Sequence, residues 1–272
     1  MASPLLLTNA MKGDIIMAQG EWKTINGAHV FIKDGQSVED AFDTSGTSAK
    51  SGSIIVGKGE KVDNLPDDLP SIRKTVNPGK HSKTSEAYGN RIKNEFGIPN
   101  VDISRIDKQC AEDVYNSIKE TFAVYPPLKN YVKSLVYDPN VKALSQWRPV
   151  SQELALGLAY ANAQALETSY NTSLKKRKFV QNTTHKYIIS HELGHAIDHM
   201  LTTKTNKFAF SVQKTICEEF HIDENYIIKN IASYAKEKPQ EFFAMHFHEF
   251  VERKNEASAI AKRIMKILKE TT

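Results

Sequence analysis

The chain has 272 residues, of which 40% are hydrophobic and 25% charged, and a formal net charge of +4. This length and composition are typical of a globular protein that buries a sizeable core, in one large domain or two modest ones. Two cysteines, Cys110 and Cys217, are too few for a disulfide framework, and we expect Cys110 to be a buried free thiol. No apolar run is long enough to span a bilayer.

The ends and the charge runs of the chain bear on its location and its partners. The first residues lack the basic segment and the apolar stretch of a signal peptide, so we expect a cytoplasmic protein, or a virion-associated one if a phage encodes it. The basic run at residues 175–178 is expected to be a solvated face, because no nucleic-acid recognition motif accompanies it. Neither a membrane nor a nucleic acid is therefore an expected partner.

Residues 1–42 contain a hairpin signal. Asn26-Gly27 stands between two short β-prone runs in the segment Trp22–Ile32, and this dipeptide is typical of a tight turn between two strands. Residues 43–99 are rich in Ser, Gly, Thr, Lys and Asp, and much of this stretch has few large apolar side chains to offset the entropy lost on ordering. We expect a linker or a loosely packed arm there.

Residues 100–272 carry mainly helical patterns. The first helix is predicted from apolar residues at three- and four-residue spacing, and Pro126-Pro127 ends it. Residues 148–172 are ambiguous, and 164–170 are interpreted as an exposed strand. The other helices are expected at 128–136, from 182–184 to about 201, at 208–220 and 224–235, from Pro239 to about 255, and at 256–268.

The sequence His191-Glu192-Leu193-Gly194-His195 is an H-E-x-x-H motif within one of these helices. Two residues four positions apart differ by about 40° around a helix, so both imidazoles can bind one ion, and Glu192 can address a water on that ion. Zn²⁺ is the expected cofactor. The alternative is a pair of solvent-facing histidines on an amphipathic helix.

A third ligand must come from elsewhere in the chain. The continuation found in metzincins is excluded, because Asp198 and Leu201 occupy its Gly and His positions. Glu241 is the best carboxylate candidate, since Phe242 and Phe243 anchor it in an otherwise apolar helix. The alternative is a solvent-exposed Glu that favours the positive end of its helix.

Asp198 and His199 follow the motif on the same predicted helix, and their roles differ. Asp198 lies within about 20° of the His191 direction and could orient a ligand histidine by accepting a hydrogen bond from its second nitrogen. An exposed Asp paired with a Lys is the competing interpretation. His199 lies on the Glu192 side and is not expected to be a ligand.

These motifs together resemble the lethal-factor-type zinc metallopeptidases, which include the Pro-Pro endopeptidases. The resemblance covers roughly residues 100–250 and depends on the H-E-x-x-H motif and on Glu241-Phe242-Phe243-Ala244. It implies that Glu241 is the third zinc ligand and that Tyr234, seven residues earlier, donates a hydrogen bond to the oxyanion. Met245 departs from the family, in which an acidic residue often stands here, so His246, His248 or Glu249 could take over that role.

A second, weaker resemblance concerns residues 21–32. This segment is similar to segments of minor capsid and head proteins of tailed phages, and phage structural proteins are therefore possible partners. An ordinary β-hairpin is the alternative interpretation.

The expected fold is α+β and mainly α, with a zincin-type metallopeptidase domain over residues 100–272 and a small hairpin-containing N-terminal arm. The expected function is that of a zinc-dependent endopeptidase, a hydrolase that cleaves protein or peptide substrates with Glu192 as the general base. Two alternatives stay open. One is a virion structural or assembly protein whose zinc site is structural or inactive, and the other is a peptidase that acts as a toxin or effector.

Overall fold

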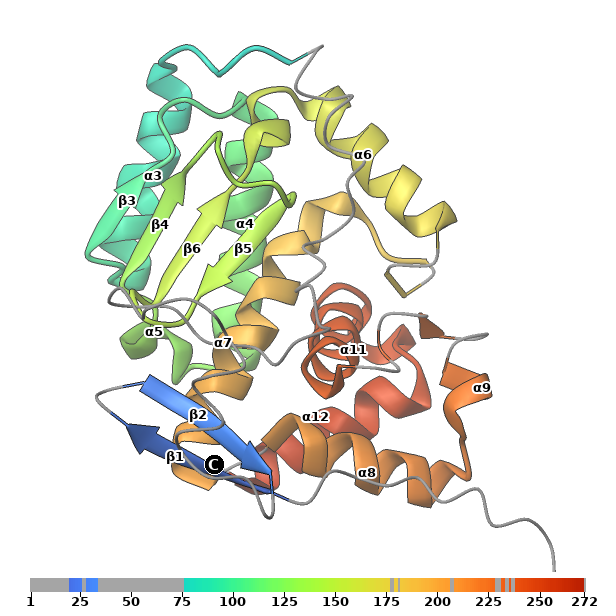
Figure 1. Cartoon of the computed structure of the whole chain (residues 1–272). Helices are drawn as coiled ribbons and strands as arrows, with labels where there is room; N and C mark the ends of the chain where they lie inside the picture. Colours follow the sequence, from blue (N-terminus) through green and yellow to red (C-terminus); the bar gives the residue numbers. More distant parts are fainter. Residues whose placement is uncertain are drawn as a thin grey trace, which may run out of the picture. The chain divides into compact units, whose positions relative to one another are not determined.

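A computed structural model of the chain describes residues 20–25, 28–33, 76–176, 179–180, 182–205, 208–227, 231–232, 235 and 238–271. The chain divides into two compact units, Met1–Asp63 and Asn64–Thr272. In the first unit, β1 (Gly20–Ile25) and β2 (Ala28–Lys33) pair in antiparallel fashion, with Ile25 opposite Ala28 (Figure 1). This register confirms the predicted hairpin, and the connecting Asn26-Gly27 lies outside the described residues.

The second unit is mainly helical around one small sheet, which agrees with the expected α+β, mainly α, class. Its elements in chain order are α3 (Lys83–Phe96), β3 (Asn100–Asp102), α4 (Lys108–Val124), α5 (Leu128–Tyr131), β4 (Ser134–Tyr137), β5 (Ser145–Arg148), β6 (Glu153–Leu156), η1 (Leu158–Ala161), α6 (Ala163–Lys175), η2 (His185–Tyr187), α7 (Ile188–Thr205), α8 (Phe208–Phe220), α9 (Glu224–Tyr226), α11 (Pro239–Arg253), η4 (Lys254–Glu256) and α12 (Ala259–Thr271). None of the described helices combines the length and the apolar character that crossing a membrane requires.

The sheet has the strand order β3-β4-β6-β5 and is mixed. The first three strands are parallel, whereas β5 runs antiparallel to β6 and forms one edge of the sheet. Helix α7 packs against this edge strand and, on another side, against α11 (Figure 1). The edge strand therefore lies beside the helix that carries the H-E-x-x-H motif.

Helix α3 falls within the range predicted to be a linker or loosely packed arm. Its residues Ile92 and Phe96 are buried and, like Ile98 just after it, belong to the same core as helix α4. Ser82 caps its start by accepting a hydrogen bond from the backbone N–H of Ser85, and Gly97 ends it in the left-handed conformation at φ 71°. The packed region therefore begins before residue 100, and an amphipathic helix lies where a linker or loosely packed arm is predicted.

The strand expected at residues 164–170 is wrong, because these residues belong to helix α6. The Asn162 side chain accepts a hydrogen bond from the Ala165 N–H and starts the helix. The buried residues Leu166, Tyr170 and Ser173 recur at spacings of four and three, which is helical periodicity. The range 128–136 also differs, since it holds the short α5 and then β4.

Candidate metal centre

Helix α7 places both histidines of the motif on one side, one helical turn apart. Ser190, which precedes His191, is buried and shares hydrogen bonds with Ser117 and Thr121 of α4, at oxygen–oxygen distances of 3.0 and 2.8 Å. Because these hydroxyls have no contact with water, their mutual hydrogen bonds hold α7 against α4 at the start of the motif. The His191 side chain is 2% exposed and that of His195 is 18% exposed.

Helix α11 delivers Glu241 in its first turn. Pro239 stands at the start of the helix, and Phe242 and Phe243 are fully buried. Their burial fixes the rotation of the helix, so that the neighbouring Glu241 faces α7.

Helices α7 and α11 lie close together at Gly194 and Ala244, where neither helix has a large side chain. A Cβ atom added at Gly194 would lie only 2.8 Å from the Ala244 Cα. Gly194 is the fourth residue of the H-E-x-x-H motif, and Ala244 comes one turn after Glu241. Glycine at this position therefore permits the short interhelical distance that brings the carboxylate to the histidines.

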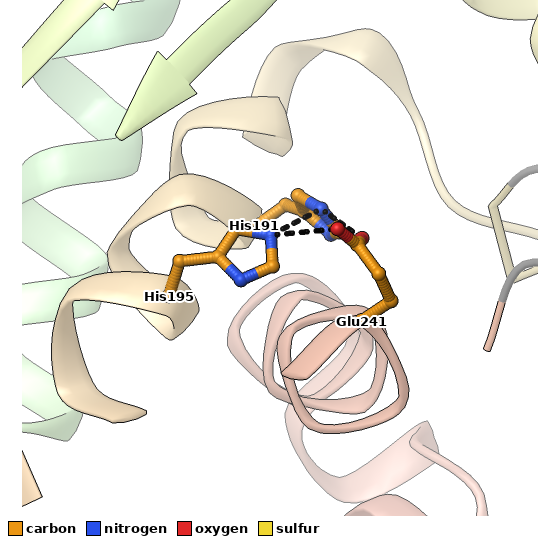
Figure 2. Close-up of side chains that lie close together, drawn as sticks. All are labelled: His191, His195 and Glu241. Atoms are coloured by element: carbon orange, nitrogen blue, oxygen red, sulfur yellow. Dashed lines mark hydrogen bonds and ion pairs between the residues drawn. The ribbon is translucent and has the colours of Figure 1, made fainter. Parts of the chain in front are cut away.

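The three side chains converge on one point (Figure 2). The Nε2 atoms of His191 and His195 are 3.2 Å apart. The Glu241 carboxylate lies 3.1 Å from His191 Nε2 through one oxygen and 3.4 Å from His195 Nε2 through the other. One ligand atom from each residue lies within 4.8 Å of those of the other two, a spacing at which one ion could contact all three.

The charges of the cluster are strongly coupled. Burial alone would lower the pKa of His195, but the Glu241 carboxylate more than offsets it and raises that pKa to about 9. Burial alone would raise the pKa of Glu241, but the His195 and His191 rings lower it well below its usual value. In the metal-free protein at neutral pH, a protonated His195 therefore pairs with an ionised Glu241.

The donor set fits a divalent metal ion. Two imidazole nitrogens and one carboxylate, all from helices that are otherwise packed in the core, are a known ligand set of catalytic zinc sites, which keep a further position open. A carboxylate that is only 12% exposed, next to one buried and one partly exposed imidazole, is costly unless its charge is compensated, and a metal ion would compensate it. Of the described residues, His191, His195 and Glu241 could hold such an ion.

Glu192 lies between the motif helix and the sheet edge. One of its carboxylate oxygens accepts a hydrogen bond from the Ser145 hydroxyl at 3.1 Å, and the other accepts one from the Trp147 backbone N–H at 2.9 Å. The side chain is buried, and both donors belong to β5. A carboxylate has about four acceptor positions, so these two bonds orient Glu192 and leave it able to accept a further hydrogen bond from a water molecule.

Ser145 and Trp147 are functional neighbours that the sequence reasoning missed. They stand in a four-residue strand, Ser-Gln-Trp-Arg, that carries no motif. The one available signal is that buried and solvent-facing residues alternate along this strand, and four residues are too few for that alternation to be recognised beforehand.

Asp198 has a different set of contacts from the one suggested by its position on α7. Its Oδ1 accepts hydrogen bonds from the Ala209 N–H at 2.9 Å and from the Thr202 hydroxyl at 3.1 Å. The first of these bonds satisfies a free N–H in the first turn of α8. These hydrogen bonds of Asp198 tie α7 to α8 and do not reach a ligand histidine. His199 contacts the Tyr131 hydroxyl through its Nδ1 and takes no part in the metal cluster.

Tyr234 lies outside the described residues. Met245, at the position where an acidic residue was expected by resemblance, is buried on α11. Two buried histidines follow it, and each pairs with a glutamate on the same helix, His246 with Glu249 and His248 with Glu252. The acidic groups near this end of the site thus stand further along α11 than the resemblance implies.

No protein-family profile matches the chain, and a comparison with curated proteins gives no significant match.

Proposed function

We propose that this chain is a zinc-dependent endopeptidase with a zincin-type domain, related to the lethal-factor-type peptidases. The observation that carries the proposal is the convergence of His191, His195 and Glu241 from two separate helices at 3.1–3.4 Å. The sequence predicts the H-E-x-x-H motif and Glu241 as separate parts of a metal site. Their meeting at one point supports a shared ion more strongly than either motif does.

The residues around the ion have separate roles. A bound zinc ion would act as a Lewis acid on the scissile carbonyl and lower the pKa of a bound water. Glu192, oriented by Ser145 and by the Trp147 N–H, would accept the proton of the attacking water and pass it to the leaving amine. Tyr234 would donate a hydrogen bond to the oxyanion, a role that rests on the resemblance alone.

The substrate that suits this site is an extended peptide. Leu144 accepts a hydrogen bond from the Gly157 N–H, so alternation along an antiparallel pair turns the backbone groups of Ser145 and Trp147 away from β6. Glu192 takes the outward N–H of Trp147, which agrees with this alternation. An extended peptide could pair with the same outward edge beside Glu192, in the way that peptides add to an open sheet edge. This edge strand replaces the one expected at residues 164–170.

The deciding experiment combines zinc analysis with cleavage of a peptide library. We expect the wild type to bind one zinc ion and to cleave. Glu192→Gln should keep the zinc and lose about 10²–10⁴-fold in rate, because general-base catalysis contributes about that much. Glu112→Gln, which changes an exposed glutamate of α4, is the matched control and should behave as the wild type.

The other outcomes discriminate between the alternatives. Zinc binding without any cleavage would favour the structural or assembly protein of a virion. A protein that neither binds zinc nor cleaves any peptide would refute the proposed family relationship. A Glu192→Gln protein that still cleaves would refute the mechanism.

A further inference from the structure

The second ring nitrogen of His191, Nδ1, takes no part in the metal cluster. Its Nε2 faces Glu241 and His195, whereas its Nδ1 is buried and has no hydrogen-bond partner among the described residues. A metal-ligating histidine almost always donates from its other nitrogen to a polar partner, which fixes the tautomer and the ring orientation. A buried N–H without a partner also costs stability.

The surroundings of His191 are aromatic on one side. The Phe179 ring meets it edge-on at a centroid distance of 5.5 Å, and Tyr170 stacks on Phe179 at 4.8 Å. Tyr170 also lies 6.4 Å from the ring of His248. His191 and His248 therefore flank the same aromatic pair. The Tyr170 hydroxyl already forms a hydrogen bond with Thr183 at 2.7 Å, so His248 is the polar group of this set that is left for His191 Nδ1.

His248 also lies on the correct face of α11. It follows Glu241 by seven residues, which is about 20° from the Glu241 direction around a helix. Its Nε2 lies 3.3 Å from Glu252, in an ion-pair contact without hydrogen-bond geometry, and this nitrogen too is buried without a hydrogen-bond partner in the described part of the chain. Burial lowers the pKa of His248, and the Glu252 carboxylate opposes this shift.

Glu252 anchors this arrangement to the start of the motif helix. Its carboxylate accepts a hydrogen bond from the Thr184 N–H at 2.9 Å, and Thr184 immediately precedes η2 and α7. Glu252 thus connects the end of α11 to the segment that leads into His191.

We propose that His248 is a positioning residue for the metal ligand His191. One buried water joins the Nδ1–H of His191 to the Nε2 of His248 and donates a hydrogen bond to the Glu252 carboxylate, so that both partnerless ring nitrogens are satisfied. A buried water of this kind needs two to four polar partners, and these three groups supply them. This inference rests on the metal centre of the proposed function.

The chain offers a matched control in His246. It lies on the same helix and is equally buried, and its Nδ1 forms a hydrogen bond with Glu249 at 3.2 Å. It is about 140° around the helix from Glu241, and Glu249 accepts hydrogen bonds from Ser258 at the start of α12. Its network therefore leads away from the metal centre.

The test compares His248→Phe with His246→Phe in the full-length protein. Zinc affinity is measured by competition with a chelator, Co²⁺ replaces zinc for an absorption spectrum of the ligand field, and the Tm of the metal-free protein reports folding. We expect His248→Phe to weaken zinc binding about 10–100-fold and to shift the Co²⁺ bands. His246→Phe should keep the wild-type affinity and spectrum, even if its Tm falls as much.

Two further variants keep the inference testable if His248→Phe does not fold. His248→Gln restores a polar side chain that can bond to the water and should bind zinc more tightly than His248→Phe. Glu252→Gln should weaken zinc binding less than His248→Phe does. Equal affinities in the His248 and His246 variants, with the wild type binding zinc normally, would overturn this inference alone. A wild type that binds no zinc would overturn the proposed function and this inference with it.

Discussion

Replacing Gly194 by Ala is predicted to damage the metal site far more than the fold. The new Cβ would lie 2.8 Å from the Ala244 Cα and 3.1 Å from its Cβ. Unbonded carbon atoms normally lie about 3.5–4.0 Å apart, so α7 and α11 must separate locally by roughly 1 Å. Glu241 stands one turn before Ala244 and moves with it. Metal–ligand distances tolerate only about 0.2 Å, so this displacement is enough to break coordination.

The effect on stability is smaller because two contributions oppose each other. Alanine is favoured over glycine inside a helix by roughly 1 kcal/mol. Overpacking of a tight contact costs typically 1–3 kcal/mol. The net loss of unfolding free energy is then on the order of 0–2 kcal/mol, and the metal-free variant should stay folded.

The assay measures zinc affinity by chelator competition and the Tm of the metal-free protein. Gly194→Ala should lower zinc affinity at least tenfold while the Tm falls by only a few degrees. Gly89→Ala is the matched control, since Gly89 is also helical and the nearest atom to its added Cβ would be Ile103 Cγ1 at 3.3 Å. A Gly194→Ala protein with wild-type zinc affinity would refute the claim that this contact sets the position of Glu241.

Three further predictions concern the cluster itself. Glu241→Ala should weaken zinc binding by more than the roughly 10–100-fold that loss of an outer partner causes, as chelator competition would show, and an unchanged affinity would remove Glu241 from the ligand set. Zinc must displace the proton that a pKa of about 9 keeps on His195 at neutral pH, so the apparent affinity should rise up to tenfold per unit from pH 6 to 8. Calorimetry in buffers of different ionisation enthalpy should detect about one proton released per zinc, and no release would contradict the pairing with Glu241. Ser145→Ala removes one hydrogen bond to Glu192, worth about 1 kcal/mol, and should slow cleavage about fivefold with zinc retained; a loss as large as that of Glu192→Gln would contradict a purely orienting role.

All three residues of the metal cluster could be predicted from the sequence, because the information for each of them is local. The four-residue spacing of His191 and His195 specifies their common face once the segment is helical, and α7 is helical there. Glu241 was found through its apolar neighbours Phe242 and Phe243, whose burial fixes the rotation of α11. The structure brings the three together, while their role in holding an ion remains a prediction.

The parts that sequence reasoning missed depend on contacts between distant segments. Nothing near Ser145 or Trp147 indicates that their strand lies beside Glu192, because that pairing is created by the sheet. Likewise, a helical projection places Asp198 near the ligand histidines. In the structure its carboxylate instead accepts a hydrogen bond from the Ala209 N–H of α8, a contact that helix periodicity does not reveal.

The errors in secondary structure have two physical causes. In α6, the buried residues have a helical spacing, but the residue types conflict, because alanine favours a helix whereas threonine and tyrosine favour a strand. In residues 128–136, an amphipathic pattern was assigned to one element, although the chain turns after α5 and enters β4 within three residues. Short elements of four residues hold too few positions for their periodicity to be distinguished.

Anomalous diffraction at the zinc edge, on crystals of the Glu192→Gln protein grown with zinc, tests the central claim most directly. The proposal predicts one strong peak about 2.0–2.2 Å from His191 Nε2, from His195 Nε2 and from a Glu241 carboxylate oxygen. A map in which zinc-loaded protein shows no peak there, or shows one that Glu241 does not reach, would contradict it.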